Sequence, residues 1–157
     1  MHNCLNGLIP NGYNEVGDLE QVKGSPFFYN ALNLVYGVDG TGKSWQVVGL
    51  LKDSASEDTP VIYIDADGSN GRGFVKHCST HNIEYVSLDN ITITAEVGEE
   101  YAGMNNSLMK INFITDALLK KYSKAVLIVD SLTSILEGMK INNAEDISPM
   151  MYAINGF

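Results

Sequence analysis

Short apolar runs alternate with polar and mixed segments along most of the chain. The runs predict strands at residues 31–36, 61–65, 83–88 and 125–130. Between them, apolar residues recur at helical spacing and predict helices at residues 43–53, 74–81 and 107–122. Apolar strands that alternate with helices favour a parallel sheet covered on both faces. We therefore expect an α/β fold of three layers with a doubly wound, mostly parallel sheet.

The remaining segments are less regular. Residues 1–28 combine Gly, Pro, Asn and acidic residues with weak periodicity, which predicts an irregular N-terminal lead-in. Residues 29–157 make up the predicted α/β domain. Within it, residues 89–106 include "ITITAEV", which fits either a strand or a long loop, and the tail could hold a short helix interrupted near Pro149.

The composition is that of a soluble globular domain. The chain has 157 residues, enough for one domain with a core, and 45% of them are hydrophobic. No run approaches the roughly 18 apolar residues that span a bilayer, so we expect no membrane partner. The N-terminus has no signal-peptide pattern, and Cys4 and Cys78 are too isolated for a disulfide framework or a metal motif. These features predict a cytoplasmic protein.

The charge balance limits how the chain can meet nucleic acid. A formal net charge of -9, with ten Lys and Arg residues, argues against a segment that coats nucleic acid by neutralising its phosphates. The basic cluster "LLKKYSK" fits the solvated end of a helix better than a DNA footprint. A contact with nucleic acid is therefore expected to be local or to depend on an assembly.

The stretch "GVDGTGKS" has the complete spacing of a P-loop, between a predicted strand and a predicted helix. Glycines let backbone N–H groups approach an oxyanion, and the start of the following helix adds partial positive charge. Lys43 supplies a full charge for the β- and γ-phosphates, and Ser44 a hydroxyl ligand for Mg²⁺. The predicted nucleotide-binding residues are Gly37, Val38, Asp39, Gly40, Thr41, Gly42, Lys43, Ser44 and Trp45. For Trp45, packing of the first helix is the alternative.

A second motif supports the first. The apolar run "AVLIVDS" ends in Asp130, and parallel sheets bind ligands at the carboxyl ends of their strands. This is the Walker B pattern, in which Asp130 and Ser44 hold Mg²⁺. The alternative is an aspartate that only ends its strand and caps the next segment.

The order of motifs resembles the RecA-like ATPase core. A strand, the P-loop, a helix, "IDAD", "YVSLD" and "LIVDS" follow one another over about residues 31–135. That family includes recombinases, hexameric replicative helicases and KaiC-type ATPases, and the "GKSW" start is also similar to RepA-type helicases and phage RecA-like ATPases. The resemblance implies ATP and Mg²⁺ as cofactors, single-stranded nucleic acid as a partner, and a homo-oligomeric ring or filament.

The resemblance also implies catalytic residues. Asp67 stands where the family often has the glutamate of "IDxE", which implies that it accepts a proton from the attacking water or orients it. Lys43, whose ammonium group balances the phosphate charge, is the second predicted catalytic residue. Asp65 competes for this role, and a turn residue before a glycine is the alternative for Asp67. Ser131 follows Asp130, so the "DE" pair is absent, which argues against AAA+ and ABC ATPases.

Further features of the family lie beyond the Walker B strand. Because RecA-like cores continue with a sensor strand and a cationic finger, we expect this core to be truncated after that strand. Arg72 is the sole arginine, and it is either a finger for a neighbouring subunit or a solvated loop residue. Two other functions stay open: a nucleotide-binding switch or assembly protein with weak hydrolysis, and a small-molecule kinase, which the scarcity of arginines disfavours.

Overall fold

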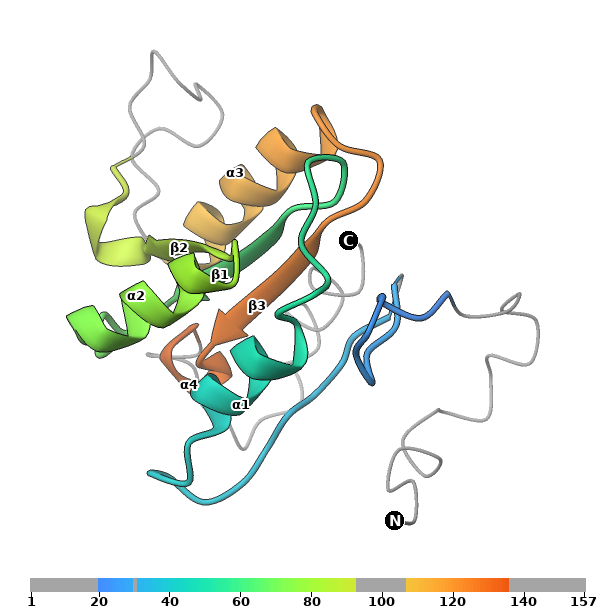
Figure 1. Ribbon diagram of the computed structural model, residues 1–157. Helices are drawn as coiled ribbons and strands as arrows, with labels where there is room; N and C mark the ends of the chain where they lie inside the picture. Colours follow the sequence, from blue (N-terminus) through green and yellow to red (C-terminus); the bar gives the residue numbers. More distant parts are fainter. Residues whose placement is uncertain (1–19, 30, 93–106, 136–157) are drawn as a thin grey trace, which may run out of the picture.

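The computed structural model describes residues 20–29, 31–92 and 107–135. Within them three strands form one parallel sheet in the order β2-β1-β3. The elements, shown in Figure 1, are α1 (Lys43–Leu50), β1 (Val61–Asp65), α2 (Arg72–Thr80), β2 (Glu84–Ser87), the 3-10 helix η2 (Leu88–Asn90), α3 (Ser107–Leu119), β3 (Val126–Asp130) and α4 (Leu132–Ile135). The three later predicted strands are thereby confirmed.

Helices cover both faces of the sheet, as the strand pattern predicted. Alternate residues of β1 point to opposite faces, because side chains alternate along a strand. One core lies under α1 and α2, and we call it the α1/α2 core: Val22, Val48, Leu51, Val61, Tyr63, Phe74, Cys78 and Ile83. The other is the α3/α4 core: Ile62, Ile64, Leu88, Ile111 and Ile135. The result is a small three-layer α/β fold.

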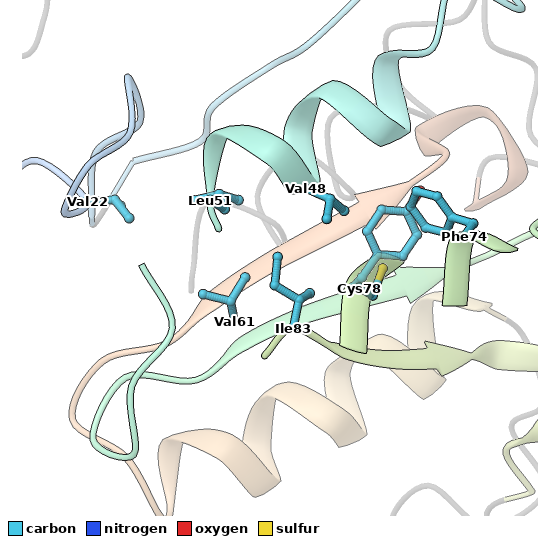
Figure 2. Packing of buried hydrophobic residues seen from close by; sticks show 8 residues of the cluster. Val22, Val48, Leu51, Val61, Phe74, Cys78 and Ile83 are labelled. Carbon is cyan, nitrogen blue, oxygen red and sulfur yellow. The ribbon is translucent and has the colours of Figure 1, made fainter. Parts of the chain in front are cut away.

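Helix α1 is docked on the sheet through two apolar side chains. Figure 2 shows Val48 and Leu51 directed from α1 toward Val61 and Ile83, in the α1/α2 core. The helix ends at Leu50, earlier than the predicted residue 53, and Leu51 is its C-cap. This docking fixes the position of the other end of α1, where the P-loop sequence ends.

The other helices follow their apolar spacing with shifted ends. Leu108, Ile114 and Leu118 of α3 pack against the α3/α4 core, to which the same helix contributes the buried Ile111. Helix α3 ends at Leu119, three residues before the predicted end at 122. Helix α2 begins at residue 72, two residues earlier than predicted, and α4 was not expected.

The predicted strand at residues 31–36 is wrong. These residues are exposed and pair with no strand of the described chain; Tyr36 is 77% exposed. The Asn33 side chain binds backbone groups here that could otherwise pair with another strand. The Asn33 side chain accepts a hydrogen bond from the Phe28 amide at 3.2 Å and donates to the Phe28 and Ala31 carbonyls at 2.9 and 3.0 Å. An apolar run alone does not make a strand when no neighbouring strand pairs with it.

The described end of the lead-in packs against the domain. Val22 is 1% exposed and belongs to the α1/α2 core, and Phe27 and Tyr29 lie against it. An isolated antiparallel bridge joins Gln21 to Phe28. The structure does not describe the ambiguous segment "ITITAEV" from residue 93 onward, the tail with Pro149 or residues 1–19.

Candidate functional site

The carboxyl ends of β1 and β3 meet at one edge of the sheet, since Asp65 and Asp130 are register partners. The chain leaves these strands toward opposite faces. Helix α2 follows β1 and joins the α1/α2 core, whereas α4 follows β3 and contributes Ile135 to the α3/α4 core. In parallel α/β sheets, this divergence is where ligands bind.

Ser44 and Asp130 meet at this edge although they are 86 residues apart in the chain. The Ser44 hydroxyl donates a hydrogen bond of 2.5 Å to Oδ2 of Asp130. Figure 1 shows the start of α1 and α4 beside the tip of β3. A hydroxyl and a carboxylate are the oxygen donors that Mg²⁺ prefers, and protein sites usually add one or two carboxylates to substrate phosphates and water. The pair therefore fits Mg²⁺ bound together with a phosphate ligand.

The loop before α1 has the backbone that its glycines allow. Gly40 and Gly42 have φ of 76° and 79°, in the left-handed region, and no atom lies within 4 Å of a Cβ built at either position. The backbone angle, rather than lack of space, therefore favours glycine. Gly42 is the N-cap of α1 and provides no side-chain acceptor, so the first N–H groups of the helix are not capped by a side chain.

Lys43 folds back over this loop. Its Nζ donates hydrogen bonds of 3.0 Å to the carbonyls of both Gly37 and Val38, and lies 3.6 Å from Oδ1 of Asp39. The loop is closed further by Thr41, whose hydroxyl donates to the Val38 carbonyl at 2.8 Å. The ammonium group is therefore held at the loop by neutral carbonyls and one exposed carboxylate. A bound phosphate group would replace these weak partners of the Lys43 ammonium group with a stronger one.

Asp65 is fully buried and holds the loop that follows β1. Its Oδ1 accepts the Gly68 amide at 2.9 Å, and its Oδ2 accepts the Asn70 amide at 3.1 Å and the Tyr85 hydroxyl. Burial opposes ionisation of Asp65, but the hydrogen bonds from Tyr85 and Asn70 outweigh it and lower the pKa of this carboxyl. Both oxygens are therefore engaged in the fold.

Asp67, the predicted catalytic residue, is exposed in that loop. Its Oδ1 accepts the Ser69 amide at 2.9 Å, which is a turn contact. Within the described residues, no hydrogen bond or ion pair joins it to Lys43 or Ser44. The structure brings together Ser44 and Asp130, and places Asp67 in the loop after β1, in the geometry of a turn residue.

Two tyrosines of the site were missed from the sequence. Tyr63 donates a hydrogen bond to Oδ2 of Asp130, and Tyr85 donates one to Oδ2 of Asp65. Burial, with the neighbouring aspartate, raises the pKa of each phenol well above its ordinary value. The signal was the alternation in "VIYID", which puts Tyr63 and Asp65 on the same face of the strand.

The other candidates lie around this edge. Trp45 packs between α1 and α2: its ring is 4.5 Å from that of His77 and 5.5 Å from that of Phe74, between centroids. Half of the Trp45 side chain is nevertheless exposed, at 49%. Arg72 begins α2 and is exposed, and the Ser131 hydroxyl lies 2.9 Å from that of Ser134.

Comparisons with protein families, curated proteins and solved structures gave no match. In residues 20–29, 31–92 and 107–135, no group of three or more His, Cys, Asp or Glu side chains lies together where it could hold a metal ion. None of the helices in this part of the chain has the length and apolar character to cross a membrane.

Proposed function

We propose that the chain is the Mg²⁺-dependent, ATP-binding and ATP-hydrolysing core of a RecA-like nucleic-acid motor or recombination protein. The observation that carries the proposal is the 2.5 Å hydrogen bond between Ser44 and Asp130. It joins the last residue of the P-loop sequence to the aspartate that ends the apolar strand. These are the two side chains that the Walker A and Walker B patterns assign to one metal ion.

The roles divide among few residues. The backbone of residues 37–44 surrounds the phosphates, and Lys43 balances their charge. Ser44 and Asp130 hold Mg²⁺, which supplies charge neutralisation at the phosphates. Asp67 orients the attacking water, for which its carboxylate has to leave the Ser69 amide that it accepts at 2.9 Å.

Nucleotide affinity of a lysine variant tests the proposal. We expect the wild-type chain to bind an ATP analogue by titration calorimetry in the presence of Mg²⁺. Lys43→Ala should weaken this binding by at least about 30-fold, because it removes a charge-assisted contact to phosphate. The matched control is Lys52→Ala, at an exposed lysine just after α1, which should leave the affinity within about twofold. Equal affinity of the wild type and Lys43→Ala would refute the site.

A nucleotide-binding switch with weak hydrolysis is the second candidate. The turn contact of Asp67 favours it, because this carboxylate is one methylene shorter than a glutamate and is already engaged with the Ser69 amide. Phosphate release with and without single-stranded DNA separates the two functions. Turnover that DNA stimulates, and that Asp67→Asn abolishes without loss of binding, supports the motor. Binding without turnover supports the switch.

The proposal includes assembly into a ring or filament on single-stranded nucleic acid. Arg72, exposed at the start of α2, is the proposed cation that reaches a neighbouring subunit. Sedimentation of the chain with the ATP analogue and DNA tests this part. Arg72→Ala should reduce turnover in the assembly and leave single-site nucleotide affinity unchanged.

A further inference from the structure

Tyr63 is buried in the middle of the sheet, yet its hydroxyl reaches the proposed metal site. Its side chain is fully buried, and its ring packs edge-on against Phe74 and parallel to Tyr85, with centroids 4.8 and 6.0 Å apart. Its hydroxyl donates to Oδ2 of Asp130, the same oxygen that accepts the Ser44 hydroxyl. One carboxylate oxygen therefore receives two hydroxyl donors.

The strand register explains this reach. Tyr63 is the partner of Ile128, two residues before Asp130, so its side chain lies on the same face of the sheet as Asp130. The phenol extends diagonally along the neighbouring strand. Tyr85 repeats the arrangement one strand further, because it is the partner of Tyr63 and donates to Asp65. The two tyrosines thus serve two different carboxylates in similar geometry.

Packing alone does not require a hydroxyl at this position. The ring packs against Phe74 within the apolar α1/α2 core, and a phenylalanine would fill the same ring space. A buried hydroxyl is costly unless it forms a hydrogen bond, and here the acceptor is Asp130.

The two donors act on one side of the carboxylate only. Among the residues that the structure describes, no donor reaches Oδ1 of Asp130. We propose that Tyr63 is a positioning residue for the metal site: its hydroxyl fixes the rotamer of Asp130, so that Oδ1 stays available to the metal ion while Oδ2 orients Ser44. This inference rests on the proposed function, and it assigns to Tyr63 a role in metal affinity rather than in phosphate binding.

A pair of matched variants tests the inference. Tyr63→Phe removes the donor to Asp130, and Tyr85→Phe makes the same change at the donor to Asp65. Nucleotide binding is titrated with Mg²⁺ and, separately, in EDTA. For Tyr63→Phe we expect the Mg²⁺ midpoint to rise about tenfold, the usual loss when a partner of a metal ligand is removed. The affinity in EDTA should stay within about twofold, and Tyr85→Phe should leave the Mg²⁺ midpoint within about twofold.

Two results would overturn the inference while the proposed function stands. One is a Mg²⁺ midpoint in Tyr63→Phe that equals that of the wild type. The other is a Mg²⁺ midpoint that rises as much in Tyr85→Phe as in Tyr63→Phe, which would mean a general loosening of the sheet. If the wild-type chain binds no nucleotide, the proposed function fails and the role of Tyr63 fails with it.

A probe that keeps the hydroxyl covers the case in which Tyr63→Phe does not fold. 3-Fluorotyrosine is placed at position 63 of the full chain, and its ¹⁹F resonance is followed while Mg²⁺ is added to the nucleotide complex. The resonance should move with the Mg²⁺ midpoint measured by titration. A resonance that does not move would also overturn the inference.

Discussion

Asp65 and Asp130 are neighbours at one sheet edge, but their oxygens have different partners. Asp130 meets two hydroxyl groups, from Ser44 and Tyr63, whereas Asp65 accepts the backbone amides of its own loop. Position at the end of an apolar strand therefore does not decide the role of an aspartate. The partners decide it, and they make Asp65 an anchor of the fold.

Asp65→Asn should lower the free energy of unfolding by about 2 kcal/mol at neutral pH, because an amide nitrogen cannot accept the hydrogen bonds made by one of the two oxygens. The pH dependence has a definite sign. The pKa of Asp65 is lowered in the folded chain, so its stabilisation is present above about pH 4, the ordinary aspartate value, and is lost as pH falls toward the lowered pKa.

Urea denaturation at a series of pH values measures both effects. The free energy of unfolding of Asp65→Asn should fall less steeply than that of the wild type between about pH 4 and pH 2. Asp58→Asn, at an exposed loop carboxylate, is the control and should follow the wild type. Parallel acid profiles for wild type and Asp65→Asn would contradict the anchoring role.

The residues that could be predicted from sequence at this site are those with short-range patterns. The spacing from Gly37 to Ser44 and the apolar run before Asp130 are visible in the chain itself. Tyr63 and Tyr85 were not predicted, because their hydrogen bonds depend on which strands become neighbours and in which register. Sequence periodicity gives the face of a strand, but it does not give its partner.

At the scale of elements, α1 shows how the docking of a helix on the sheet positions Ser44 beside Asp130. Val48 is the buried residue of the helix, and the two leucines at its end differ sharply: the C-cap Leu51 is 1% exposed and Leu50 is 45% exposed. Leu51→Ala should therefore destabilise the chain by about 3 kcal/mol, through lost burial and a cavity, and Leu50→Ala by less than about 1 kcal/mol. Thermal or urea unfolding compares the two, and equal losses would contradict the observed docking of α1.

The segment at residues 31–36 shows the limit of apolar content as a guide to strands. The same pattern correctly predicted β1 and β3, which find partners on their edges, whereas here the Asn33 side chain occupies local backbone groups instead. Whether a segment pairs with a neighbouring strand depends on the rest of the sheet, so it cannot be predicted from that segment alone.

Hydrogen exchange shows whether residues 31–36 are unpaired or form a strand in solution. Amides of residues 32–36 should exchange at close to unprotected rates, because they take part in no ladder of the described chain, whereas amides of β1, paired on both sides, should exchange orders of magnitude more slowly. Mass spectrometry of the corresponding peptides measures this. Protection of residues 32–36 comparable to that of β1 would mean that they form a strand in solution.

At the scale of the whole molecule, the layer arrangement was the most predictable feature. Alternation of apolar strands with helices led directly to a parallel sheet with both faces covered. The contribution of Val22 to the α1/α2 core was not predictable, because the lead-in has no periodicity, and neither was the ion pair of 2.5 Å between Glu20 and Lys124. Both join segments that are distant in sequence.

The α1/α2 core contains a thiol that reports on the opening of the whole molecule. Cys78 is fully buried on α2, and burial raises its pKa to about 11. At about pH 8 an ordinary thiol is roughly a quarter thiolate, but this one should be about one part in a thousand, and the reagent cannot reach it in the folded chain. In a Cys4→Ser variant, where Cys78 is the remaining cysteine, labelling by a disulfide reagent should therefore wait for unfolding.

The rate of labelling should rise with urea in step with the population of the unfolded chain. Leu51→Ala weakens the same core, so a loss of about 3 kcal/mol should speed labelling at low urea by about 100-fold. Leu50→Ala should label at nearly the wild-type rate. Rapid labelling of the unperturbed chain without urea would show that α2 opens locally and that the core does not unfold as one unit.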